Sequence, residues 1–98
     1  MYKILKTDIF DTWLKKLRDL NGKGRILSRI KGAELGNLGD FKALCSGLHE
    51  MRIDCGPGYR LYFMKEKDRM IILLSGGSKS TQDKDIKKAL KIMKEIED

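Results

Sequence analysis

Hydrophobic positions recur with the spacing of an α-helix in two stretches near the start of the chain. In the first, which begins at Asp8, apolar residues return every three or four positions and charged residues occupy the opposite face. Its apolar face consists of Ile9, Phe10, Trp13, Leu14, Leu17 and Leu20. The second stretch, 23–35, directs Ile26, Leu27, Ile30 and Ala33 inward. Since Asn21-Gly22 separates the two, we expect the first helix to end there and a helical hairpin to form.

Short apolar runs separated by turn residues predict β-strands in the middle of the chain. They cover residues 41–44, 48–55, 59–64 and 70–75, and a shorter run at 2–6 precedes the first helix. The Gly56-Pro57-Gly58 connection predicts a type II turn with Pro57 and Gly58 at its two central positions. Residues 70–74 have no polar face, so we expect a central strand that is covered on both sides.

A third amphipathic stretch begins near Ser80 and reaches the end of the chain. Ser80 and Asp83 match a capping box, and Thr81 is an alternative cap. The apolar stripe of this helix consists of Ile86, Ala89, Leu90, Met93 and Ile96. The order of elements predicts one α+β domain over residues 1–98, in which an N-terminal strand and a helical hairpin pack on an antiparallel sheet that is followed by a C-terminal helix.

Composition narrows the class of protein. The chain has 98 residues, of which 41% are hydrophobic and 36% charged, which is too apolar for a disordered tail and too polar for a membrane protein. No apolar run reaches the ~18 residues that a membrane span requires, and residues 1–10 lack the core of a signal peptide, so we expect a cytoplasmic protein. Cys45 and Cys55 are expected to be reduced thiols in the core, and His49 a half-buried structural residue. With one histidine, a zinc site built by the protein is not expected.

The net charge of +7 is spread along the chain. Residues 1–40 carry +4, residues 41–77 carry +2 and residues 78–98 carry +1. This distribution suits a polyanionic partner such as RNA, and it equally suits an ordinary solvated surface. Charge alone leaves both interpretations open.

Alternation in the second and third predicted strands of the middle region brings charged residues together. Glu50 and Arg52 share one face of their strand, and Arg60 and Tyr62 share one face of the next. If the intervening loop has an odd number of residues, Arg52 lies opposite Arg60 and Glu50 lies near Tyr62. The cluster is then either a site for an anion or a surface ion network of little energetic weight.

A second candidate is the segment 76–81, Gly-Gly-Ser-Lys-Ser-Thr, between an apolar strand and a helix. Backbone N–H groups at a helix N-terminus, a flexible glycine pair and Lys79 are able to hold a phosphate. The spacing of a P-loop is absent, and the alternative is a strand-to-helix turn with a capping hydroxyl.

Several segments in a fixed order resemble one family. They are 36–44 (GNLGDFKAL), 47–53 (GLHEMRI), 56–62 (GPGYRLY) and 76–86 (GGSKSTQDKDI), with Phe10-x-x-Trp13-Leu14-x-x-Leu17 before them. On these motifs the chain resembles the addiction-module killer proteins, a phage-related, HigB-like branch of the RelE/ParE toxin superfamily. The resemblance covers nearly the whole chain.

The resemblance implies a small toxin that is paired with an antitoxin, usually one with a helix-turn-helix domain. It implies a RelE-like fold, in which a helical hairpin packs beside a curved antiparallel sheet. It also implies a ribosome-dependent mRNA endonuclease that uses the 2′-hydroxyl of the RNA as the nucleophile, with no metal and no cofactor. The ribosome and mRNA would then be its further partners.

The same resemblance suggests roles for individual residues. Arg60 matches the phosphate-binding arginine that RelE-like nucleases carry in a Tyr-Arg-x-x-Tyr strand, and Arg52 matches a basic position on the preceding strand. Lys79 lies near the position where those nucleases carry a second arginine, after the last strand. Glu50 stands at a position that is lysine in RelE itself, and it is the strand geometry that makes it the candidate general base. The expected RNA contacts are Tyr62, Tyr59, Gln82 and Lys42.

One departure from the family pattern keeps other functions open. The catalytic Tyr or His that several relatives carry near the C-terminus is absent, and Gln82 and Asp85 occupy that region, so the general acid has no candidate. The alternatives are a non-catalytic, ParE-like toxin that inhibits a protein target such as DNA gyrase, and a toxin that has lost its activity and only binds its antitoxin.

Overall fold

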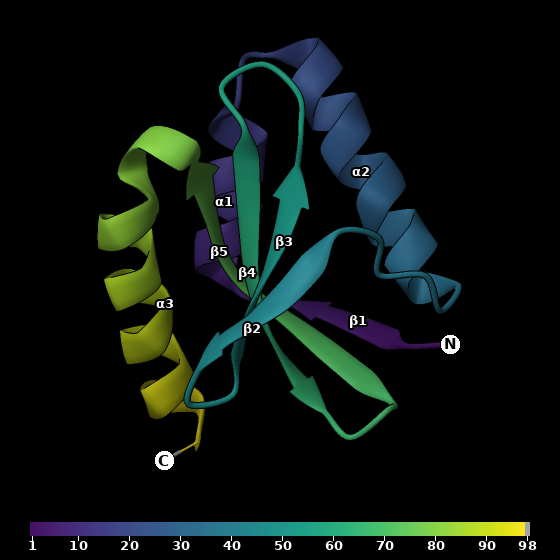
Figure 1. Cartoon of the computed structure of the whole chain (residues 1–98), viewed down its shortest axis with the longest axis vertical. Coiled ribbons are helices and arrows are strands. Elements are labelled where there is room, and N and C mark those ends of the chain that lie inside the picture. Colours follow the sequence, from purple (N-terminus) through teal and green to yellow (C-terminus); the bar gives the residue numbers. More distant parts are fainter. Residues whose placement is uncertain (98) are drawn as a thin grey trace.

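The computed structural model describes residues 1–97 and has the α+β architecture that the sequence predicts (Figure 1). Along the chain the elements are β1 (Lys3–Lys6), α1 (Asp8–Lys16), α2 (Leu20–Glu34), β2 (Phe41–Cys45), β3 (Leu48–Ile53), β4 (Tyr59–Glu66), β5 (Met70–Ser78), a 3-10 turn at Lys79–Thr81 and α3 (Gln82–Glu97). The strands form one twisted sheet in the order β1-β5-β4-β3-β2. The predicted central strand, β5, lies between β1 and β4.

The four strands from β2 to β5 form the predicted antiparallel sheet, and β1 adds a parallel strand to it, so the whole sheet is mixed. β1 pairs in parallel with β5, in a register that aligns Lys3 with Met70 and Lys6 with Leu73, whereas the other neighbours are antiparallel. Thr7 follows β1 directly, and its hydroxyl donates to the Leu74 carbonyl oxygen at 2.7 Å. The same hydroxyl accepts from the Phe10 N–H and caps α1. The parallel direction of β1 thus places the start of α1 against β5.

The first helix ends earlier than predicted. α1 stops at Lys16, and α2 begins at Leu20 with Asp19 as its N-cap, whose carboxylate accepts from the Gly22 N–H at 3.0 Å. Asn21 and Gly22 thus lie in the first turn of α2 and do not end α1. A side chain at position 22 would overlap the ring of Tyr59, so glycine is needed there for packing. The Asn-Gly pair misled the prediction because it is also common at helix C-termini.

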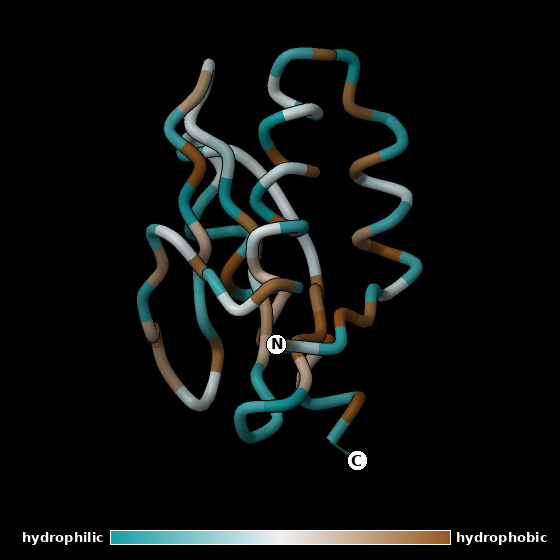
Figure 2. The backbone as a smooth tube through the Cα atoms, turned by 90° about the vertical axis from the view of Figure 1, so that its right-hand side faces the viewer, coloured by the Kyte–Doolittle hydropathy of each residue, from teal (hydrophilic) through white to brown (hydrophobic). Residues whose placement is uncertain are grey.

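Helices cover both faces of the sheet and create two hydrophobic layers. Between the sheet and α1 and α2 lie Phe10, Ile26, Ile30, Met51, Leu61 and Phe63, with other apolar residues. Between the sheet and α3 lie Leu48, Tyr62, Leu74, Ala89, Ile92 and Met93. Figure 2 shows hydrophobic and hydrophilic residues alternating along the helices and strands, a pattern that gives each element one apolar face. Within the described residues 1–97, no helix combines the length and the apolar character needed to cross a membrane.

Several positions predicted to be buried are exposed. Leu20, predicted on the face of the first helix, is 79% exposed because α1 ends at Lys16 and Leu20 begins α2. Leu27 is 46% exposed, since the packed face of α2 is narrower than the apolar pattern suggested. Ile9 and Ile96 are also largely exposed. Cys45 is exposed on the edge strand β2, contrary to the expected core position, whereas Cys55 is half-buried and packs against the first layer.

The connections at one end of the sheet also differ from the predictions. β5 continues through Gly76, Gly77 and Ser78, so the glycine pair belongs to a strand and not to a phosphate-binding loop. The capping box is formed by Ser78 and Thr81, two residues before the predicted pair. The turn after β3 is closed by the Gly58 N–H donating to the Cys55 carbonyl at 3.0 Å, one residue earlier than expected, although Gly58 has the expected positive φ of 78°.

Candidate functional site

Two rows of polar residues cross the sheet beneath the first turns of α3. The register of β3, β4 and β5 defines both rows and confirms the predicted pairing of Arg52 with Arg60 and of Glu50 with Tyr62. The first row contains Arg52, Arg60 and Gly77, and the second contains Lys42, Glu50, Tyr62 and Ser75. The next row along the strands is apolar and includes Leu48, Met64 and Ile72. Polar chemistry on this face is therefore confined to the end of the sheet that α3 covers with its N-terminus.

Glu50 is the centre of this polar region. Its carboxylate is fully buried, and its Oε1 lies 2.7 Å from Nε of Arg60 and accepts from the side-chain amide of Gln82 at 2.7 Å. The side chain of Arg60 is only 12% exposed. The guanidinium is thus fixed from one side by a carboxylate that is itself held by α3. A buried carboxylate with these contacts positions Arg60 and does not meet solvent, so the predicted base lies away from the surface.

Three buried oxygens in this region have no hydrogen-bond partner among the described residues. They are Oε2 of Glu50, the hydroxyl of Tyr62 and Oγ of Ser75, which the register places side by side across β3, β4 and β5. Burial, and then the charge of Glu50, raise the pKa of Tyr62 above its ordinary value, so its hydroxyl stays protonated at neutral pH. Tyr62 is itself fully buried, which keeps its ring from stacking on an RNA base in this conformation.

Arg52 lies at the outer end of the first row and reaches solvent. Its side chain is 37% exposed and forms an ion pair with Asp40, with 3.2 Å between Nη2 and Oδ1. Arg29 on α2 fixes the backbone around this pair, because its guanidinium donates to the carbonyl oxygens of Arg52 (2.6 Å), Leu38 (2.9 Å) and Asp40 (3.1 Å). No pattern in the sequence indicates this role of Arg29, since its partners are backbone atoms distant along the chain.

Lys79 lies on the other side of Arg60. Its backbone N–H donates to the Gly58 carbonyl oxygen at 2.7 Å, and its side chain is exposed. A Cβ atom at Gly58 would lie 3.4 Å from Cβ of Lys79 and 3.8 Å from Nη1 of Arg60, so the two cationic residues flank the same glycine. The predicted neighbourhood of Arg60 and Lys79 is therefore present.

Asp85 is a second carboxylate near Arg60 that the sequence did not single out as a site residue. It projects from α3 onto Gly77, where any Cβ would overlap its carboxylate, and Gly77 lies directly opposite Arg60. The Thr81 hydroxyl donates to Oδ2 of Asp85. Unlike Glu50, Asp85 is only half-buried. A glycine at the end of β5, four residues before Thr81, was the one sequence signal for this contact.

Of the other expected RNA-binding residues, Tyr59 lies apart from this cluster and Lys42 lies at its edge. Tyr59 points to the opposite face of the sheet, where its hydroxyl donates to Oδ2 of Asp19 at 2.7 Å and burial raises its pKa to about 12. Lys42 is opposite Glu50 but lies on the edge strand β2 and is exposed. Gln82, by contrast, is in the cluster through its hydrogen bond to Glu50. Among residues 1–97, no group of three or more His, Cys, Asp or Glu side chains is arranged to hold a metal ion.

Comparison with known proteins identifies one informative relative. No family model matches the chain. The chain is 48% identical over 94 residues to a protein of Haemophilus influenzae described as an uncharacterized protein, and the match covers 96% of this chain and 95% of that protein. This chain belongs to the family of that Haemophilus protein. The match spans nearly the whole of both proteins, so the relationship extends over the full domain.

For this member of the Haemophilus protein's family, the cluster brings three cationic side chains to one end of the sheet, two of them paired with carboxylates. Arg60 is oriented from below by Glu50, Arg52 flanks it on β3, and Lys79 flanks it at the end of β5. Guanidinium groups that are held in this way bind phosphate or carboxylate oxygens with defined geometry. The arrangement is able to bind an anion and to stabilise negative charge that develops on it.

Proposed function

We propose that the protein is the toxin of a type II toxin–antitoxin module and that it cleaves mRNA on the ribosome. The proposal combines the resemblance to the HigB-like branch of the RelE/ParE toxins with the chemistry of the cationic surface formed by Arg52, Arg60 and Lys79. The net charge of +7 suits approach to ribosomal RNA. A protein that acts on translating ribosomes works in the cytoplasm, which agrees with the expectation from the sequence.

The observation that carries the proposal is the contact between Glu50 and Arg60. A buried carboxylate lies 2.7 Å from Nε, and Nη1 lies beside Gly58, the glycine that Lys79 also flanks. A scissile phosphate bound there would meet cations from β3, β4 and the segment after β5. Such preorganised charge stabilises the additional negative charge of a phosphorane transition state.

The reaction requires two proton transfers besides charge stabilisation. The 2′ oxygen attacks phosphorus and the bond from phosphorus to the 5′ oxygen breaks, which gives a 2′,3′-cyclic phosphate and a 5′-hydroxyl. Because Glu50 is buried, we assign the proton of the 2′-hydroxyl to Oδ1 of Asp85, the half-buried carboxylate opposite Arg60. The ammonium group of Lys79 supplies the proton to the 5′ oxygen. No metal or cofactor takes part in this scheme.

The partner of the toxin in this proposal is a cognate antitoxin, of the helix-turn-helix class that the resemblance implies. A segment of that antitoxin with acidic residues would complement Arg52 and Arg60 and cover the surface that binds mRNA. Charge reversal at Arg52, as in Arg52→Glu, should then weaken the toxin–antitoxin complex. Unchanged affinity would place the antitoxin on another face.

The test is a cleavage assay with a purified translation system. Primer extension on a translated reporter should reveal new 5′ ends that depend on translation, and Asp85→Asn should remove them while the protein remains folded. Cleavage that persists in Asp85→Asn would refute the assignment of the base, and an absence of new ends with the wild-type protein would refute the nuclease proposal.

A second candidate is a non-catalytic toxin of the ParE type, which inhibits a protein target such as DNA gyrase. Two observations favour it, namely the full burial of Glu50 and Tyr62 and the lack of a Tyr or His in the region of Gln82 and Asp85. Growth arrest with intact mRNA and a DNA-damage response would support this candidate over the nuclease.

A further inference from the structure

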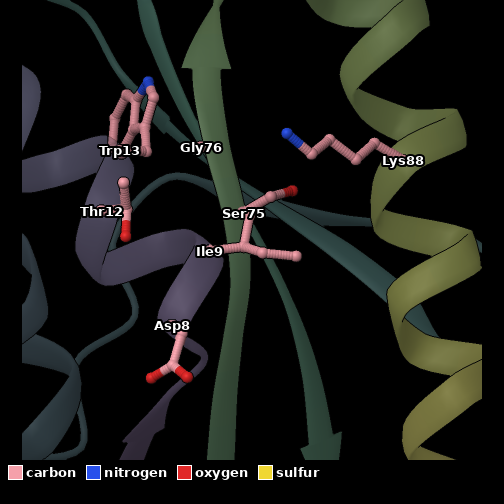
Figure 3. Close-up of a pocket in the computed structure, with 7 residues that line it drawn as sticks. All are labelled: Asp8, Ile9, Thr12, Trp13, Ser75, Gly76 and Lys88. Atoms are coloured by element: carbon pink, nitrogen blue, oxygen red, sulfur yellow. The ribbon is translucent and has the colours of Figure 1, made fainter.

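A pocket of about 410 Å³ lies where α1 and α3 face each other across β5 (Figure 3). Its walls come from Ile9 and Trp13 on α1, Ser75 and Gly76 on β5, and Lys88 on α3. Arg52, Arg60 and Lys79 do not line it. An inference about this pocket therefore stands independently of the proposed nuclease activity.

The apolar side of the pocket forms beside β5 in the region beyond the last residue of β1. Pairing between β1 and β5 stops at Lys6 and Leu73, and α1 then runs beside the rest of β5. The indole of Trp13 lies flat against Gly76, where a Cβ atom would overlap the six-membered ring. Ile9 adds an aliphatic wall and is 40% exposed. A large aromatic surface and an exposed aliphatic side chain in one concavity are typical of a site for a small organic molecule.

The polar groups of the pocket lie on the side that faces α3. Ser75 is 2% exposed, and its Oγ is one of the buried oxygens without a partner in the part of the chain that the structure describes. Figure 3 shows the Ser75 hydroxyl on the side that faces α3, with the ammonium group of Lys88 extending toward it. A hydroxyl donor and an ammonium group together are suited to a compact anion.

We propose that this pocket binds an organic carboxylate whose apolar part is a ring or a short chain. The carboxylate would lie between Lys88 and Ser75, and the apolar part would lie on Trp13 and Ile9. Since Asp8 also lines the pocket and, among the described residues, Lys88 is the one cation that does, a monoanion fits this lining better than a doubly charged phosphate. The ligand would satisfy the Ser75 hydroxyl and link α1 to α3 across β5.

Trp13 makes the proposal directly measurable, because it is the single tryptophan of the chain and lines the pocket. Titration of the full chain with phenylacetate should change the intrinsic fluorescence in a saturable way. The uncharged analogue phenylacetamide and inorganic phosphate should each bind at least about ten-fold more weakly than phenylacetate. Equal affinity for phenylacetate and phenylacetamide would overturn the assignment of the anion position, and no saturable change with phenylacetate would overturn the site itself.

Variants separate binding in the pocket from general quenching. Lys88→Met should weaken phenylacetate about ten-fold, and Ser75→Ala should weaken it to a smaller extent. Lys87→Met is the matched control, because Lys87 is the preceding lysine of α3, is exposed and does not line the pocket. Circular dichroism verifies that each variant is folded. Equal loss in Lys87→Met and Lys88→Met would reduce the effect to overall charge and contradict the proposal.

Discussion

Glu50 and Arg60 form an ion pair in which the carboxylate is completely buried and the guanidinium is nearly so, with 2.7 Å between Oε1 and Nε. Gln82 donates a hydrogen bond to the same oxygen. The pair connects β3 to β4 and both strands to the first turn of α3. The same contact therefore stabilises the polar cluster and orients Arg60, which we expect to bind phosphate.

Replacing Glu50 by Gln should destabilise the protein by about 3 kcal/mol, because removal of one charge leaves the other buried without compensation. Urea denaturation at neutral pH measures the effect. In an Arg60→Met background, the same Glu50→Gln change should cost clearly less, since the buried cation is then absent. Equal costs in the two backgrounds would show that the pair is not coupled.

Gly77→Ala should destabilise the fold by about 1–3 kcal/mol, because the new Cβ would overlap the Asp85 carboxylate. A second substitution, Asp85→Ala, should restore most of the loss by removing that carboxylate. The matched control is Gly24→Ala, where α2 has open space around the Cβ position and alanine should add about 0.5–1 kcal/mol. Failure of Asp85→Ala to rescue Gly77→Ala would contradict the contact.

Arg29→Ala should cost about 3 kcal/mol, since it removes hydrogen bonds from a charged group to the carbonyl oxygens of Leu38, Asp40 and Arg52. Arg25→Ala, four residues earlier on the same helix and exposed, should change the free energy of unfolding by less than about 0.5 kcal/mol. Thermal and urea denaturation of the two variants provide the comparison. Similar values for both would mean that Arg29 does not secure this connection.

The raised pKa of Tyr59 predicts that the protein loses stability at alkaline pH. Burial and the bond to Asp19 raise the pKa of Tyr59 from its ordinary 10.0 to about 12 in the folded protein. The folded state therefore favours the protonated phenol, so the resulting stabilisation is complete below pH 10 and disappears as the pH rises toward 12. Tyr59→Phe should lack this part of the pH dependence when unfolding is measured across that range. An identical alkaline slope in the variant would assign the loss to other groups.

The strands were predictable from the sequence to a large extent because their side chains alternate and their turns contain glycine. That alternation, together with the assumption of an odd number of loop residues, paired Glu50 with Tyr62 and Arg52 with Arg60 as the structure does. It did not reveal that α3 buries Glu50 and Tyr62, since burial of a charged or phenolic residue depends on which helix covers it.

Other features required the three-dimensional arrangement. The parallel β1 brings the Thr7 hydroxyl to the Leu74 carbonyl oxygen, and Gly22 packs against Tyr59 at the start of α2. Ser75, Asp85 and Arg29 escaped detection because their significance comes from residues distant in sequence. The hydrophobic period likewise extended the first helix to Leu20, which begins α2, and overestimated the buried face of α2 at Leu27.

The most direct test of the central proposal compares Arg60→Ala with Arg69→Ala in the translated-mRNA cleavage assay. Arg69 is an exposed arginine at the opposite end of β4 and β5 and should not affect cleavage. We predict that Arg60→Ala abolishes both the new 5′ ends and the growth arrest, whereas Arg69→Ala retains both. Cleavage of the reporter by folded Arg60→Ala at the wild-type rate would contradict the proposed role of this surface.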